Sequence, residues 1–177
     1  KLEFVSHGLK GADILMDEAS VTATENAIMA AVRARGITVI RNAASEPHIQ
    51  ELCRFLNRLG ARIENIGSNT LHIEGVDGLH GGEFAVGPDY LEVVSLVGAA
   101  VVTRGELRIR NAGVNYLEMI AQVFRRLGVV WNVDGDDLIV PSDQPLEVVT
   151  DLGGVIPEIK TNVWPAFPTD LMSIAIT

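Results

Sequence analysis

Cysteine is nearly missing from this sequence: Cys53 is the single one among 177 residues. An intramolecular disulfide is therefore excluded, and such cysteine usage is typical of a reducing compartment, so we expect a cytoplasmic location. Long apolar runs are missing too. The longest, from Val93 to Val102, contains Ser95 and Gly98 and is too short to span a bilayer. The opening residues lack the apolar segment of a signal peptide, and we expect no membrane partner.

Positive charge is scarce. The sequence has 14 Lys and Arg against 23 Asp and Glu, which gives a formal net charge of −9. Proteins that hold nucleic acid neutralise phosphates and are normally basic, so this balance predicts no nucleic-acid partner, although a local basic cleft can lie within an acidic protein. Apolar residues make up 47% of the chain, which is ordinary for a globular protein and argues against disorder.

Patterns that bind metals or cofactors are also missing. The four histidines have no ligand spacing with one another, with Cys53 or with a carboxylate pair, so a zinc site is not expected. The acidic run 134–137 lacks the rest of a calcium loop and is predicted to form a hairpin turn. The glycine pairs at 81–82 and 153–154 fit neither a P-loop nor a dinucleotide fingerprint, and we interpret them as turns. We therefore expect no metal and no cofactor.

What the sequence does contain is an internal repeat. The segment from Arg35 to Ala43 recurs 69 positions later, and the triplet Arg58-Leu-Gly60 recurs 68 positions later. Two matches in the same order at nearly the same spacing predict a structural unit of about seventy residues. A third copy has a helix start near Thr169, and the chain stops within that helix at Thr177, which is typical of a fragment.

Both complete copies have the same predicted order of elements. The first has a helix opened by a capping box at 22–25 and ending near 36, a strand around 37–39, a helix with its apolar face at 49–56 and a hairpin over 61–74. The second has a helix over 89–103, a strand over 106–110, a helix with its apolar face at 117–124 and a hairpin turning at 134–136. After Pro141 the sequence predicts one more strand, over 146–150, before the helix start at Thr169. Gly60 and Gly128 stand where each second helix ends. Cys53 is predicted to be a core residue, and His72 to face solvent.

Two segments could bind a substrate. Ser20-Val21-Thr22 stands at a predicted helix start, where free amides and the helix dipole favour an anion such as a diphosphate; a plain N-cap explains the same residues. The second segment runs from Trp164 to Leu171 and holds two prolines, two aromatic residues and the carboxylate of Asp170 at a helix start. The prolines fix where that carboxylate points, and here too an ordinary helix cap is the alternative.

These motifs, taken together, resemble the UDP-N-acetylglucosamine 1-carboxyvinyltransferase family of enolpyruvyl transferases. Members move the enolpyruvyl group of phosphoenolpyruvate to the 3′-hydroxyl of UDP-N-acetylglucosamine, the first committed step of peptidoglycan synthesis, and release phosphate. The resemblance covers essentially the whole chain, and it rests on the segments 9–12, 17–26, 41–47, 73–76, 88–92 and 165–171.

The resemblance implies an α/β fold of two globules, each an inside-out α/β barrel of three βαβαββ units. It places the boundary between globules near Val86 to Pro88. Residues 1–86 would then be a unit of the first globule, and residues 87–177 a unit of the second globule plus the start of the next. Neither globule would be complete in this chain.

The resemblance also implies roles and partners. Ser20, Val21 and Thr22 match the segment that contacts the nucleotide's diphosphate, and Asp170 matches the general base toward the sugar hydroxyl. The substrates would be UDP-N-acetylglucosamine and phosphoenolpyruvate, the full-length protein would be a monomer, and the fragment could self-associate. Many members have Gly where Thr22 stands, and some have Lys where Glu18 stands.

Most of the phosphoenolpyruvate site implied by the resemblance lies outside this chain. The family's Lys-Asn pair, general-acid cysteine loop and phosphate-clamping arginines have no counterpart here, and Cys53 does not match that loop. The isolated chain is therefore expected to be inactive. Two other interpretations stay open: the related transferase that acts on shikimate 3-phosphate, and a non-catalytic binding or scaffold protein with the same fold.

Overall fold

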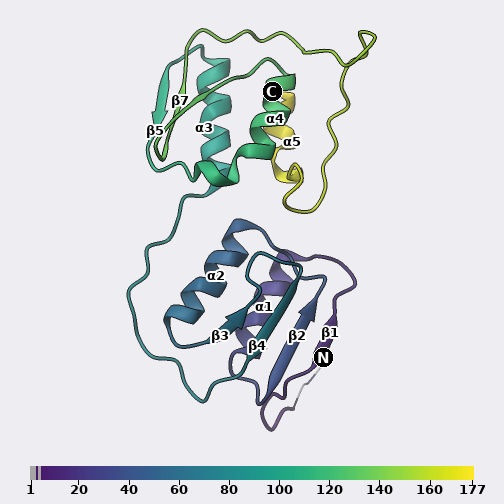
Figure 1. The fold of residues 1–177 in the computed structure, drawn as a ribbon, viewed down its shortest axis with the longest axis vertical. Coiled ribbons are helices and arrows are strands. Elements are labelled where there is room, and N and C mark those ends of the chain that lie inside the picture. The colour runs from purple at the N-terminus through teal and green to yellow at the C-terminus, as the bar shows by residue number, and fades with distance from the viewer. Residues whose placement is uncertain (1–2, 4) are drawn as a thin grey trace. The chain divides into compact units, whose positions relative to one another are not determined.

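A computed structural model describes residue 3 and residues 5–177 of the chain. Within it the chain divides into two compact units, unit 1 over Lys1–Val86 and unit 2 over Gly87–Thr177 (Figure 1). Each unit has its own cluster of buried apolar side chains. The two units are described separately below.

Unit 1 has a four-stranded sheet with two helices. Its strands run in the spatial order β1-β2-β4-β3, with β1 parallel to β2 and the other neighbours antiparallel. The elements are β1 (Asp13–Leu15), α1 (Val21–Ala31), β2 (Ile37–Arg41), α2 (Pro47–Arg58), β3 (Arg62–Glu64) and β4 (Thr70–Glu74). This order is βαβαββ, as the resemblance implied, and it confirms the predicted α/β class.

The core of unit 1 follows from the two-residue alternation of its strands. Thr38 and Ile40 of β2 are buried, while Ile37 and Arg41 on the opposite face are exposed. The buried strand side chains pack with apolar residues of α1 and α2, among them a fully buried Cys53. Each such side chain contributes about 1.5–3 kcal/mol when removed from water. Cys53 is thus in the core as predicted, and the exposed His72 on β4 confirms the second prediction.

Unit 2 has a three-stranded antiparallel sheet, in the order β5-β7-β6, and three α-helices. Residues 75–89, between β4 and α3, contain no strand, so unit 2 begins at a helix. The elements are α3 (Tyr90–Val102), β5 (Leu107–Ile109), the 3₁₀ turn η1 (Val114–Tyr116), α4 (Glu118–Arg126), β6 (Asn132–Asp134), β7 (Asp137–Val140), the 3₁₀ turn η2 (Thr169–Leu171) and α5 (Met172–Ile176).

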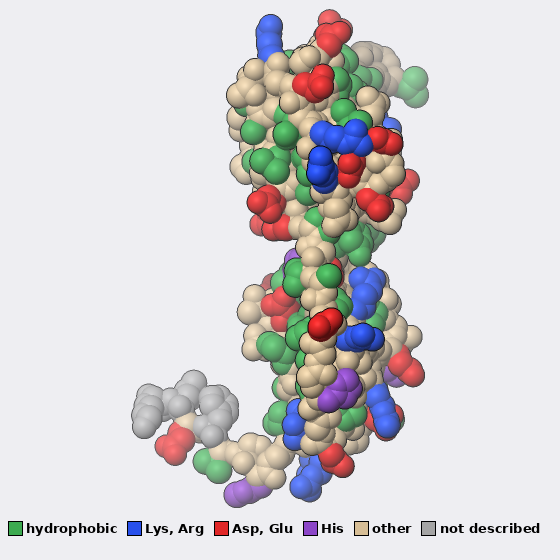
Figure 2. Space-filling view, turned by 90° about the vertical axis from the view of Figure 1, so that its left-hand side faces the viewer, with side chains coloured by type: hydrophobic (Ala, Val, Ile, Leu, Met, Phe, Trp, Pro, Cys, Tyr) green, Lys and Arg blue, Asp and Glu red, His purple; other side chains and the backbone are tan. Residues whose placement is uncertain are grey.

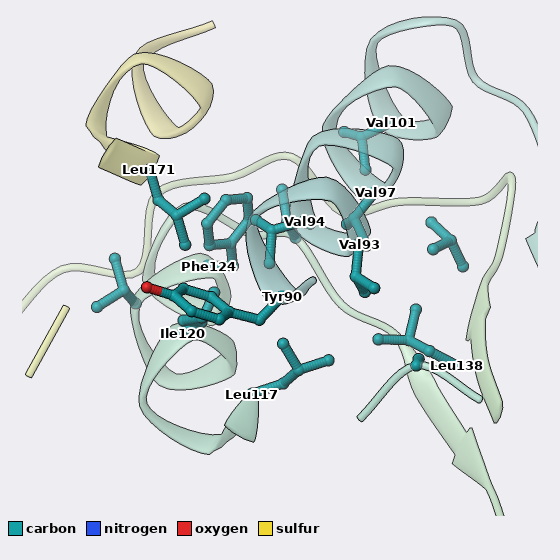
Figure 3. Packing of buried hydrophobic residues seen from close by; sticks show 14 of the residues in the cluster. Tyr90, Val93, Val94, Val97, Val101, Leu117, Ile120, Phe124, Leu138 and Leu171 are labelled. Carbon is teal, nitrogen blue, oxygen red and sulfur yellow. The ribbon is translucent and has the colours of Figure 1, made fainter. Parts of the chain in front are cut away.

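Helix α3 forms the centre of unit 2. Its side chains Val93, Val94 and Val97 point into the cluster where Phe124 of α4 and Leu171 of η2 also lie (Figure 3). Burial of this face explains the valines at 93, 94 and 97, whereas Leu96 and Val102 on the other face of α3 are exposed, with 43% and 56% of their surface accessible.

The repeat is visible in the backbone. Asn42 and Asn111, each following its copy's strand, are both in the left-handed region, with φ of 56° and 50°. Gly60 and Gly128 follow the last residues of α2 and α4 and have positive φ, as a residue one past the C-cap commonly does. Similar left-handed conformations at matched positions support one structural unit used twice.

The structure corrects two local predictions. The cap of α1 is Ser20 and not Thr22, because the helix starts at Val21 and the Ser20 side chain accepts from the amide of Ala23. The segment 146–150 is not a strand. Its amides at Leu146 and Val149 donate to the carbonyls of Gly128 and Arg126, so these backbone groups follow the end of α4 instead of joining the sheet.

Candidate functional site

The start of α1 holds the first group of candidate residues. Ser20 has extended backbone angles, and its Oγ accepts from the amide of Ala23 at 3.4 Å. Val21 and Thr22 form the first turn, where amides have no acceptor within the helix. These free amides lie at the positive end of the helix dipole, an arrangement that binds anions in many proteins. The structure therefore brings Ser20, Val21 and Thr22 together at the start of one helix, with Ser20 as its N-cap.

Charges close to this turn in the sequence are negative. Asp17 and Glu18 precede Ser20, and both are exposed. Arg41 on β2 is held by Asp13, with Nε to Oδ1 at 2.8 Å and Nη2 to Oδ2 at 2.9 Å. This hydrogen-bonded pair lowers the pKa of Asp13 and raises the pKa of Arg41. Backbone amides, and not a cationic side chain of this loop, are therefore what unit 1 offers an anion at the start of α1.

The face shown in Figure 2 carries acidic and basic side chains interspersed over both units. Opposite charges are also paired: Arg108 of β5 donates to Asp134 and, at 2.9 Å, to Asp137. The hydrogen bond from Arg108 is the main cause that lowers the pKa of Asp137. Arg108 thus links β5 to both strands of the hairpin β6–β7, which already pairs with β5 through backbone hydrogen bonds.

Asp170 lies in unit 2, in η2 just before α5. Its neighbours Phe167 and Leu171 are almost fully buried, with 2% and 1% of their surface exposed, while Asp170 itself is exposed. The chain is thus anchored in the core on both sides of the carboxylate. The preceding Trp164 packs against Tyr90, with ring centroids 5.4 Å apart, and the Trp164–Pro165 peptide bond is cis.

A hollow of about 290 Å³ lies beside this segment, lined by residues that include Tyr116, Gln122 and Trp164. Asp170 is not among its lining residues. Within unit 2, therefore, the carboxylate is presented to solvent at a helix start and not from inside this hollow.

Sequence reasoning missed three polar residues of unit 1, two of which contact the start of α1 or the loop before it. Thr24 is fully buried, and its hydroxyl accepts from the amide of Ala44 at 3.0 Å. Asn42 donates from its side chain to the carbonyl of Met16 at 3.0 Å. One carboxylate oxygen of Glu46, before α2, is buried with no hydrogen-bond partner. The sequence offered two signals of these contacts: a threonine among the residues on the predicted buried face of its helix, and an asparagine directly after a predicted strand.

Other chemistry finds little support in the described residues. No three His, Cys, Asp or Glu side chains among residues 3 and 5–177 gather where a metal ion could be held. Burial raises the pKa of the Cys53 thiol to about 11, so this side chain is a poor nucleophile near neutral pH. None of the helices in the described part of the chain has the length and apolar content needed to cross a membrane.

The βαβαββ order of unit 1 defines an α/β fold, and solved structures of enolpyruvyl transferases share it. The enolpyruvyl transferase NikO from Streptomyces tendae superposes with a TM-score of 0.70 at 24% identity, covering 77% of this chain and 36% of that one. An EPSP synthase from Acinetobacter baumannii gives a TM-score of 0.61 at 17% identity, covering 85% and 34%. At these identities the likeness shows the fold.

The family follows from the sequence comparison. The family model described as EPSP synthase (3-phosphoshikimate 1-carboxyvinyltransferase) matches residues 1–177, and the chain belongs to this family.

Two relatives are similar over almost the entire chain, and both are named UDP-N-acetylglucosamine 1-carboxyvinyltransferase. The protein of Bradyrhizobium diazoefficiens is 56% identical over 176 residues, which is 99% of this chain and 41% of the relative. The protein of Treponema denticola is 53% identical over 171 residues, 97% of this chain and 40% of the relative. The chain thus spans about two fifths of the length of the relatives it matches.

Proposed function

We propose that this chain is part of a transferase that moves the enolpyruvyl group of phosphoenolpyruvate to the 3′-hydroxyl of UDP-N-acetylglucosamine and releases phosphate. The observation that carries the proposal is the 56% and 53% identity, over nearly the whole chain, to proteins with that activity in their name. This reaction would make the protein an enzyme of peptidoglycan synthesis.

In this proposal the α1 turn binds the diphosphate of the sugar nucleotide. The first-turn amides of Val21 and Thr22 would donate to phosphate oxygens, and the hydroxyl of Ser20 stands beside them. The carboxylates of Asp17 and Glu18 repel an anion, so this turn alone would bind it weakly. Cationic groups elsewhere in the full-length protein would complete the site.

Asp170 would act as the general base. Its exposed carboxylate can accept the proton of the 3′-hydroxyl as that oxygen adds to C2 of phosphoenolpyruvate, while C3 takes up a proton from a group outside this chain. Loss of phosphate from C2 and of a proton from C3 would then restore the double bond of the enolpyruvyl group. The buried neighbours Phe167 and Leu171 fix the backbone that carries it, which is what a positioned base requires. The phosphoenolpyruvate site would be supplied mostly by residues outside this chain.

The second candidate is a transferase that acts on shikimate 3-phosphate, because the family model carries that description. The two candidates are separated by incubating the full-length protein with phosphoenolpyruvate and either acceptor, and measuring released phosphate. We expect release with UDP-N-acetylglucosamine and only background with shikimate 3-phosphate. Phosphate release with shikimate 3-phosphate alone would contradict the first candidate and support the second. No release with either acceptor would favour a binding or scaffold protein.

A further inference from the structure

The loop between β1 and α1 is fastened at its helix end by one buried side chain. Thr24, in the second turn of α1, is fully buried. Its hydroxyl donates to the carbonyl of Ser20 at 2.7 Å and accepts from the amide of Ala44 at 3.0 Å. The first turn of α1 is thereby joined to the segment that follows β2, which lies twenty residues further along the chain.

The same segment fastens the other end of the loop. Asn42 donates from Nδ2 to the carbonyl of Met16 at 3.0 Å, and the amide of Met16 donates to the carbonyl of Arg41. Asn42 reaches this position because its backbone is left-handed, with φ of 56°, a conformation that asparagine tolerates better than most residues. The loop is therefore held at both ends by residues 41–44. The Thr24 hydroxyl also lies 3.6 Å from the sulfur of Met16, and within the loop the Ser20 amide donates to the carbonyl of Glu18.

We propose that Thr24 and Asn42 are positioning residues for the nucleotide site, holding the first-turn amides of α1 in the orientation that receives the diphosphate. This inference rests on the proposed function of Ser20, Val21 and Thr22. A turn that is ordered before binding does not have to be ordered by the ligand, and this improves affinity. Loss of the Thr24 hydroxyl would leave the buried Ala44 amide without its acceptor, so the two segments would separate or shift.

The test uses the full-length protein and two substitutions at Thr24, of which Thr24→Ser removes one methyl group. Thr24→Val removes the hydroxyl and keeps the volume, whereas Thr24→Ser keeps the hydroxyl. We expect Thr24→Val to raise the KM for UDP-N-acetylglucosamine about tenfold, the scale on which one buried hydrogen-bond group acts. We expect kcat and the KM for phosphoenolpyruvate to stay within about twofold, and Thr24→Ser to stay within about twofold of wild type in all three constants.

A matched control separates positioning from stability. Ile73→Val removes one methylene from a fully buried side chain of β4 that makes no side-chain hydrogen bond, and lowers the melting temperature of the same unit. It should leave the KM for the nucleotide unchanged. Equal rises of KM in Ile73→Val and Thr24→Val would overturn the inference, since loss of stability would then explain both.

If Thr24→Val does not fold, the variant Asn42→Gly provides a second, independent test of the same proposal. Glycine keeps the left-handed backbone and removes only the donor to Met16, and we expect the same selective rise in the nucleotide KM. An unchanged KM in a folded Thr24→Val or Asn42→Gly variant, with an active wild-type enzyme, overturns this inference alone. A wild-type protein that neither binds UDP-N-acetylglucosamine nor releases phosphate with it overturns the proposed function as well.

Discussion

The local sequence pattern predicts the position of some side chains of the candidate site, whereas the hydrogen-bond partners of others are known only from the folded structure. Ser20 at a helix start follows from the preference of serine for the N-cap, although the capping-box pattern placed that start two residues too late. The roles of Thr24 and Asn42 depend on partners at Ala44 and Met16, which are distant in sequence. A pattern of spacings within one helix contains no information on such contacts. The functions of Ser20, Val21, Thr22 and Asp170 stay predictions.

Asp170 is the residue whose substitution should affect turnover most within this chain. In the full-length protein, Asp170→Asn keeps the size of the side chain and removes its basicity. We expect kcat to fall by about 10²–10⁴-fold, the usual contribution of a general base, while the Kd for UDP-N-acetylglucosamine changes by less than about threefold. Steady-state phosphate release and calorimetric titration measure the two quantities.

Asp143→Asn serves as the control for that substitution, because it removes an exposed carboxylate of the same unit that the proposal does not use. It should leave both quantities at their wild-type values. If turnover of Asp170→Asn is also unchanged, Asp170 is only part of a helix start.

Helices and strands were predicted best where a local signal decides them. Apolar periodicity located α2 and α4, and the glycines at 60 and 128 follow the ends of both. The segment 146–150 has the composition of a strand, yet its amides bond to the end of α4. A segment with strand propensity becomes a strand only when its backbone pairs with a neighbouring strand. Here the amides of Leu146 and Val149 donate to the carbonyls of Gly128 and Arg126 instead.

The two helix-ending glycines provide a matched pair of substitutions. Alanine at either position adopts an unfavourable positive φ, at a cost of about 1–3 kcal/mol. At Gly60 the new Cβ would meet only the flexible ring of His80, at 3.0 Å, but at Gly128 it would collide with the backbone of Glu147. We expect Gly128→Ala to destabilise its unit more than Gly60→Ala destabilises its own.

Hydrogen exchange makes that comparison specific. In Gly128→Ala the amides of Leu146 and Val149 should exchange faster than in wild type, because the collision pushes the segment 146–149 away from its acceptors. Unchanged protection of these amides would contradict the expectation.

At the scale of the whole chain, the repeat predicted a unit that is used twice but not how completely each copy is built. Unit 1 has the full βαβαββ order, while unit 2 begins at α3 without a preceding strand. A match between two segments shows that they fold alike, but it says nothing about elements that the matched segments do not contain. Apolar side chains of the stretch 146–156 are also left exposed, with Leu152 at 99% and Ile156 at 76%.

The isolated 177-residue chain should therefore self-associate and should not catalyse phosphate release. Exposed apolar surface favours association, and the implied phosphoenolpyruvate groups lie outside the chain. Sedimentation velocity should show mass rising with concentration, and less so for the double variant Leu152→Asp/Ile156→Asp. The comparably exposed Val86→Asp, outside that stretch, serves as the control. Phosphate release by the purified chain would contradict the second expectation.

The burial of Cys53 makes the chain convenient for a physical experiment. It is the single thiol and lies in the core of unit 1, where a reagent reaches it only when that unit opens. Both tryptophans, Trp131 and Trp164, pack against the core of unit 2. Thiol labelling and intrinsic fluorescence therefore report on different halves of the unmodified chain, so a difference between their denaturation midpoints would reveal two separate transitions without any engineered probe.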